Sequence, residues 1–224
     1  MNCQFCNVTM QTLNTDRFGR VACTQCSKAG LCRYCSGLCG ADGVNDQVCP
    51  FCEASAVKTE MDLADAVPPV RDFIHSFGIR LVNRVRVTLV TPPPYVPGER
   101  RTLGTTHRTI GGSPAVRAIQ IERGLPLTLF GATLAHEMIH GWMAGVDGVD
   151  PSEEEGLCEL ISSWWLVHRG GPFAKAMLED METDPDPVYG VWFRVVRDRY
   201  AHLSQTETIS AIAATHQLPV VGSP

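Results

Sequence analysis

The chain has 224 residues, of which 44% are hydrophobic and 19% are charged. That apolar content is enough for one or two folded domains and excludes a wholly disordered chain. The formal net charge of −5 argues against a protein that binds nucleic acid along its whole surface, because such proteins are usually basic. No apolar run reaches the ~20 residues of a membrane helix, and the start, MNCQFC, does not resemble a secretory signal. We therefore expect a cytoplasmic protein with no nucleic-acid or membrane partner.

Nine of the ten cysteines lie within the first 52 residues, as four Cys-x-x-Cys pairs plus Cys39. Each pair places two thiolates close enough to share a tetrahedral zinc ion, and two pairs complete one site. Sequential pairing predicts two structural zinc ions, although a cross-braced arrangement, or Cys39 in place of Cys35, also suits the spacing. The predicted ligands are Cys3, Cys6, Cys23 and Cys26 for the first site, and Cys32, Cys35, Cys49 and Cys52 for the second. We expect a zinc-binding module over residues 1–56 that replaces a hydrophobic core or binds a protein partner.

Residues 57–224 are predicted to form an α+β domain, with a short β-sheet followed mostly by helices. Alternating apolar and β-branched side chains predict three strands, with a proline-rich loop between the first two. These strands are expected over 79–90, 102–110 and 115–122, and the loop over 92–98. The last of them is either an ordinary strand or an edge strand that aligns an extended peptide.

Helical spacing of apolar residues predicts one helix before the strands and several after them. The first is expected over 61–77, where Pro68 and Pro69 interrupt it or start a second helix. The later helices are expected over 127–144, 152–168, 172–182 and 188–214, with Ser152 as a possible N-cap.

Residues 136–140 read His-Glu-Met-Ile-His on the central apolar helix. His136 and His140 are four residues apart, so both imidazoles project from one helix face toward a single metal ion. Glu137 would lie beside them, within reach of a metal-bound water. An apolar helix that buried these three polar groups without a metal would be strongly destabilised. The motif therefore predicts a catalytic zinc site with an open position for water.

The third ligand is expected from the next helix, because no third histidine follows His140 at the required spacing. Glu155 is the candidate and Glu154 the rival, while a solvated first helical turn could account for two of the three glutamates 153–155. Glu159, one turn beyond Glu155, is placed to accept the second N–H of a ligating imidazole. Cys158 is expected to pack as a small apolar side chain.

Three blocks of this chain resemble a plant family of LIM-domain, ubiquitin-activated growth-regulating peptidases. The blocks are GLPLTLFGATLAHEMIHGWM, EEEGLCELISSWWL and DPVYGVWFR, and the similarity extends from about Ala56 to the C-terminus. The resemblance implies a gluzincin-type zinc endopeptidase in which His136, His140 and Glu155 are ligands and Glu137 is the base. Cys23 stands where a LIM domain has histidine, so the module is LIM-like or zinc-ribbon-like. Only three of the nineteen basic residues are lysine, which indicates a GC-rich, bacterial genome.

The predicted function is hydrolysis of peptide bonds in protein substrates. Glu137 would take the proton of the attacking water, and Tyr189 is the candidate donor to the substrate oxyanion, with His168 and His202 as weaker ones. The alternatives are a catalytically idle adaptor that binds a protein through its zinc module, and a zinc protein that binds nucleic acid.

Overall fold

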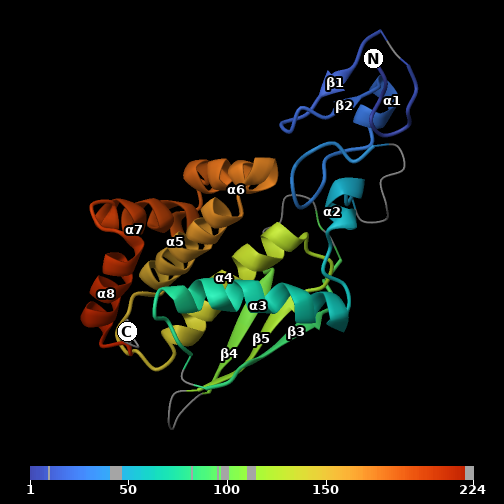
Figure 1. Ribbon diagram of the computed structural model, residues 1–224. Helices are drawn as coiled ribbons and strands as arrows, with labels where there is room; N and C mark the ends of the chain where they lie inside the picture. Colours follow the sequence, from blue (N-terminus) through green and yellow to red (C-terminus); the bar gives the residue numbers. More distant parts are fainter. Residues whose placement is uncertain are drawn as a thin grey trace.

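The computed structural model describes residues 1–9, 11–40, 47–81, 83–94, 96, 101–109 and 115–219. The chain has a mixed α/β fold, in which nearly half of the residues lie in helices. Figure 1 shows the described part of residues 1–56, called here the cysteine-rich module, at one corner of the molecule, with α7 and α8 on the other side and α6 between them. Within the described ranges, no helix is both long enough and apolar enough to cross a bilayer.

The cysteine-rich module contains little regular structure. Its antiparallel strands β1 (Asn14–Thr15) and β2 (Val21–Ala22) and its helices α1 (Thr24–Ser27) and α2 (Pro50–Ala54) are all short. Its core consists mainly of the buried cysteines themselves. The module is joined to the rest of the chain by backbone pairing at residues 55–57, which bond to residues 124–127 just before the central helix. The predicted boundary at residue 56 is therefore a paired segment of backbone.

The first long helix, α3 (Glu60–Ser76), begins with a capping box between Thr59 and Asp62. Both Pro68 and Pro69 lie inside it, so the expected interruption at these prolines is wrong. A proline inside a helix removes a hydrogen bond and costs about 3 kcal/mol. Burial of an apolar stripe on both sides of the prolines offsets this cost, because the helix packs against the protein core through Leu63, Val67, Val70 and Ile74.

The sheet has three strands, β3 (Arg86–Val90), β4 (Gly104–Arg108) and β5 (Val116–Glu122), in the order β3-β5-β4. Strand β5 pairs with β3 in parallel and with β4 in antiparallel orientation. The interpretation of 115–122 as an edge strand is therefore wrong, because β5 is central and β3 and β4 are the edge strands of the described sheet. The expected first strand is shorter, since residues 79–81 and 83–85 are not in a strand. Residues 82, 95, 97, 98 and 110 of the expected strands and loop lie outside the described residues.

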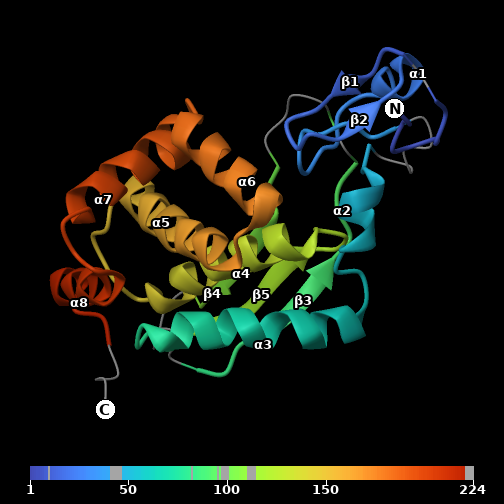
Figure 2. The ribbon, with the colours of Figure 1, turned by 45° about the horizontal axis from the view of Figure 1, so that its top comes forward.

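Six helical segments follow the sheet, and most of their apolar residues form one core with α3 and β5. They are α4 (Leu127–Trp142), α5 (Pro151–Arg169), α6 (Gly171–Thr183), the π-helix η1 (Pro187–Val191), α7 (Trp192–Tyr200) and α8 (Gln205–His216). The single helix expected over 188–214 is thus three, because Ser204 and Glu207 form a capping box that starts α8. The N-cap of α5 is Asp150, which accepts from two backbone amides, and not Ser152. In Figure 2, α4 lies between the sheet and the outer helices.

Candidate metal centre and cleft

The two histidines of the central motif lie on α4 and face the same point. His136 Nε2 is 3.1 Å from His140 Nε2. Glu155 on α5 faces both, with Oε2 3.2 Å from His136 Nε2 and Oε1 3.5 Å from His140 Nε2. Four ligands at 2.0–2.1 Å around a tetrahedral zinc ion are separated by about 3.3 Å. These three side chains therefore fit a zinc ion, and the buried Glu155 Oε2 has no hydrogen-bond partner among the described residues.

Each imidazole also contacts its own carboxylate through the other ring nitrogen. His136 Nδ1 lies 3.3 Å from Glu159, and His140 Nδ1 lies 2.7 Å from Glu154. Such contacts orient a ligating imidazole and select the tautomer that leaves Nε2 free for a metal. The geometry thus separates the rival carboxylates, because Glu155 faces both Nε2 atoms whereas Glu154 faces an Nδ1. Glu154 is held in turn by Arg108 of β4.

None of the three glutamates in the first turn of α5 is merely solvated. Glu153 pairs with Arg199 of α7, while Glu154 and Glu155 face the imidazoles. Gly156 follows this turn, and a Cβ there would lie 2.7 Å from the carbonyl oxygen of Trp192. A glycine at position 156 is therefore needed for the close approach of α5 to the start of α7.

The electrostatics of the site favour a cation. Burial opposes charge on His136, but its contacts with Glu155 and Glu159 outweigh burial and raise its pKa to about 10. Burial likewise opposes charge on His140, and its contacts with Cys158, Glu154 and Glu155 raise its pKa to about 12. Burial would raise the pKa of Glu155, but the two imidazoles lower it to about 2. An excess of negative charge thus faces the imidazoles, which a bound metal ion would neutralise.

Cys158 is a second possible partner for a metal ion at this site. Its sulfur lies within 4.8 Å of a nitrogen of both His136 and His140, and its side chain is fully buried. Sequence reasoning predicted only packing for it. Burial raises the pKa of the Cys158 thiol to about 12, whereas Glu155 is already an anion. Glu155 differs from Cys158 in that its two carboxylate oxygens lie 3.2 and 3.5 Å from the two imidazole Nε2 atoms.

Glu137 is buried between α4 and the edge strand β4. Thr106 Oγ1 donates to Glu137 Oε2 at 2.7 Å. A Cβ at Gly104 would lie 2.7 Å from the Cγ of Glu137, so only glycine lets the strand approach this carboxylate. Alternate residues of β4 thus meet successive turns of α4: Gly104 and Thr106 contact Glu137, and Arg108 contacts His140.

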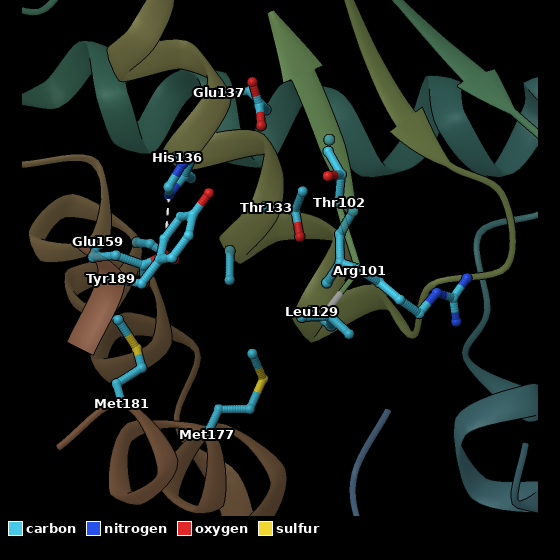
Figure 3. A pocket seen from close by; sticks show the side chains of 14 residues that line it. Arg101, Thr102, Leu129, Thr133, His136, Glu137, Glu159, Met177, Met181 and Tyr189 are labelled. Atoms are coloured by element: carbon cyan, nitrogen blue, oxygen red, sulfur yellow. Dashed lines mark ion pairs between the residues drawn. The ribbon is translucent and has the colours of Figure 1, made fainter. Parts of the chain in front are cut away.

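Tyr189 lies in the π-helix η1, whose start is capped by the Asp186 side chain. It lines the same cavities as His136 and Glu137, and Figure 3 shows its ring beside His136. The two weaker oxyanion candidates lie elsewhere. His168 packs against Phe73 with ring centroids 5.0 Å apart, and His202 is exposed beyond α7.

The site opens into a cleft along β4, formed by two adjoining cavities. One, of about 450 Å³, extends toward Arg108 and Pro151. The other, of about 340 Å³, extends toward the start of α4 and is lined by Leu129, Met177 and Met181. The first cavity is lined mainly by polar and charged side chains, whereas the second has a mixed lining that combines apolar side chains with polar ones such as Arg101, Thr133 and Glu159.

The cysteines cluster as sequential pairing predicts. Cys3, Cys6, Cys23 and Cys26 form one group, and Cys32, Cys35, Cys49 and Cys52 form another. Both groups could hold a zinc ion, and the cross-braced alternative is wrong. Cys39 is buried beside Cys32 but lies outside the second group. Arg20 donates to two sulfurs of that group, those of Cys49 and Cys35.

Sequence reasoning missed Thr106, Arg108 and the contact between Glu154 and His140. The alternation in GTTHR was a signal that residues 104, 106 and 108 share one strand face. It could not show that this face meets α4, because that depends on how the strand packs.

The fold and the site define a mixed α/β protein with three groups of side chains that could hold metal ions. A family model described as DA1-like, Protein DA1, matches residues 57–179. This is more than half of the chain, and the chain belongs to the DA1-like family.

Several curated plant proteins are similar to this chain. Protein DA1-related 7 of Arabidopsis thaliana is 30% identical over 148 residues, which cover 51% of this chain and 26% of the relative. Protein DA1 of Arabidopsis thaliana is 30% identical over 138 residues, which cover 47% of this chain and 25% of the relative. The LIM domain-containing protein HDR3 of Oryza sativa subsp. japonica is 43% identical over 93 residues, which cover 40% of this chain and 18% of the relative. The matched part spans about a quarter or less of each of these relatives, and no solved structure matches the chain.

Proposed function

We propose that the chain is a zinc-dependent metallopeptidase of the gluzincin type, with His136, His140 and Glu155 as the ligands of a catalytic zinc ion. The observation that carries this proposal is the convergence of His136 Nε2, His140 Nε2 and the Glu155 carboxylate, which lie 3.1 to 3.5 Å from one another. This set lies in a cleft, beside the buried carboxylate of Glu137. The two four-cysteine groups would hold structural zinc ions.

A zinc ion bound there supplies the Lewis acidity that activates water near neutral pH. Glu137 takes a proton from the attacking water and later gives it to the leaving amine. Thr106 and Gly104 hold the Glu137 carboxylate between β4 and α4. Tyr189 donates a hydrogen bond to the oxyanion that develops on the substrate carbonyl.

Strand β4 is an edge strand of the sheet and lines the cleft. An extended peptide can therefore add to β4 by backbone hydrogen bonds, which bind a chain independently of its sequence. This supports protein or peptide substrates over small molecules.

The test is cleavage of denatured casein and of a proteome-derived peptide mixture by the full chain and by Glu137→Gln. We expect the wild type to cleave and to bind about three zinc ions. Glu137→Gln should keep that zinc content and lose at least about a hundredfold in rate, since a general base contributes 10²–10⁴-fold. Glu60→Gln, which alters an exposed carboxylate at the start of α3, is the matched control. Full activity of Glu137→Gln would refute the assigned role, and a zinc-loaded protein that cleaves nothing would favour an adaptor.

A further inference from the structure

Helix α6 forms one wall of the second cavity of the cleft. Met177 and Met181 are one turn apart and line the cavity of about 340 Å³, with Leu129 and Ala132 of α4 on another wall. Figure 3 shows the two methionines on the opposite side of this cavity from Glu137, with Tyr189 between them and His136. His136 and Glu137 line the same cavity. A substrate side chain that enters it therefore belongs to a residue next to the bond being cleaved.

The lining of this cavity indicates which side chains it accepts. The volume is near the lower end for ligand pockets, and Leu103 joins the other apolar side chains around it. Methionine is unbranched and adapts its shape to its neighbours. The apolar side chains suit one large apolar side chain, such as Leu, Met or Phe, although Arg101 and Glu159 also line the cavity.

The other side of α6 is held by the cysteine-rich module. The Arg17 guanidinium donates to both carboxylate oxygens of Asp180, at 2.8 and 2.9 Å, and to the carbonyl oxygen of Ala176 at 2.9 Å. Nearby, the rings of Phe18 and Phe173 make an edge-to-face contact with centroids 6.4 Å apart. The residues held by Arg17 directly precede the two methionines along the helix.

Helix α6 is also anchored by partly buried side chains that pack against the core, and by Glu182, which pairs with Arg197 of α7. Only Ala174 and Ala176 are fully buried among its residues. Tyr34 of the module also reaches this region and lines an adjoining cavity of about 370 Å³ with Met177 and Met181. The position of both methionines therefore depends on the module as well as on the core.

We propose that the cysteine-rich module sets the substrate preference by holding α6, so that Met177 and Met181 form a pocket for a large apolar side chain beside the cleaved bond. The proposal rests on the peptidase function proposed above. Arg17 is a positioning residue in this scheme, since it touches α6 and not the substrate.

The test starts from mass-spectrometric mapping of the bonds that the full chain cleaves in a proteome-derived peptide mixture. Two peptides are then compared that differ only by Leu or Ala at the preferred position. We expect a Leu-to-Ala ratio in kcat/KM of about tenfold or more, as one apolar pocket can provide. The ratio should fall at least threefold in Met177→Ala/Met181→Ala and in Arg17→Ala. Simple destabilisation would lower both rates and leave the ratio unchanged.

Two controls match these variants. Lys175→Ala removes an exposed charge from the solvent side of α6, and Met61→Ala removes an exposed methionine from α3. Both control variants should keep the wild-type Leu-to-Ala ratio in kcat/KM. Hydrogen–deuterium exchange provides a readout independent of activity, and residues 171–183 should exchange faster in Arg17→Ala than in Lys175→Ala.

The outcomes separate the two proposals. Cleavage without a side-chain preference would overturn the proposed pocket. A preference that Arg17→Ala leaves intact would overturn the dependence of the pocket on the module. In both cases the peptidase function stands. Unchanged exchange of α6 in Arg17→Ala would by itself overturn the role of Arg17. A wild-type protein that cleaves no peptide would overturn the peptidase function and the pocket together.

Discussion

Thr106 on the edge strand and Glu137 on the central helix are joined by a hydrogen bond of 2.7 Å, from the hydroxyl of Thr106 to the carboxylate Oε2 of Glu137. The same hydroxyl lies 2.7 Å from the backbone carbonyl oxygen of Glu137. One short side chain thus ties the proposed general base to the strand that lines the cleft. A hydrogen bond to a charged group contributes about 1.5–3 kcal/mol, so this contact is expected to matter for catalysis.

Thr106→Val keeps the shape of the side chain and removes the donor. We expect kcat to fall about tenfold, which corresponds to about 1.4 kcal/mol, with little change in KM because the substrate is not touched. Thr106→Ser should retain most of the activity. Steady-state kinetics on one peptide measure this, with Thr105→Val as the control, because the Thr105 hydroxyl bonds to the Gly104 carbonyl oxygen. Equal losses in the Val and Ser variants would show that the hydroxyl is not what holds Glu137.

The third ligand can be assigned by counting zinc. Glu155→Ala should bind about two zinc ions per chain, because the carboxylate that faces both Nε2 atoms is lost. Cys158→Ala should keep about three, because His136, His140 and Glu155 remain at the spacing of zinc ligands. Elemental analysis after dialysis gives the counts. The reverse pattern would make Cys158 the ligand in place of Glu155.

Tyr34 of the cysteine-rich module gives the protein a pH-dependent contact. Its hydroxyl donates to Glu122 at 2.9 Å and accepts from Arg33 at 2.6 Å. Burial, together with Glu122, raises the pKa of Tyr34 from 10.0 to about 12. Because the folded pKa exceeds the unfolded one, the unfolded chain loses this proton first. The stabilisation is fully present below pH 10 and is lost as the pH rises toward 12.

We expect the free energy of unfolding of the wild type to fall by on the order of 1–2 kcal/mol more than that of Tyr34→Phe between pH 9 and about pH 11.5. Urea unfolding at matched pH values measures the difference. Parallel pH profiles for the two proteins would show that Tyr34 ionises equally in the folded and unfolded chain.

The two four-cysteine groups should differ in their effect on the rest of the protein. The second group packs against Phe18, Tyr34 and Phe173, and two of its sulfurs accept from Arg20. The first group packs only against Phe5 and Leu13 among the partly buried apolar side chains described. Loss of the second zinc should therefore loosen α6, whereas loss of the first should remain local.

We expect both Cys49→Ser and Cys6→Ser to lose one zinc ion. Cys49→Ser should lower the main melting temperature by at least about 5 °C, since 1 kcal/mol corresponds to about 2–4 °C at this size. Cys6→Ser should shift it by less than about 2 °C. Calorimetry alongside zinc analysis distinguishes them, and equal shifts would argue against a special link between the second group and α6.

Local spacing along the chain was sufficient to predict several features. Each Cys-x-x-Cys pair forms one turn, so the spacing predicts which two cysteines come together, whereas the sharing of a site by two pairs depends on the folded module. His136 and His140 face one point because a helix places residues four apart on one side. These relations involve neighbours along the chain, so the geometry of one turn or one helix decides them.

The tertiary structure decided the relations between distant segments. Nothing in EEEG shows that Glu155 faces both imidazoles while Glu154 faces an Nδ1, because that depends on how α5 packs against α4. The edge position of β4, the passage of α3 through Pro68 and Pro69, and the hold of Arg17 on α6 likewise depend on packing between elements. Local patterns specify which face of a helix or strand is apolar. The partner of that face is selected by the free energy of burying the whole core at once, which no single segment contains.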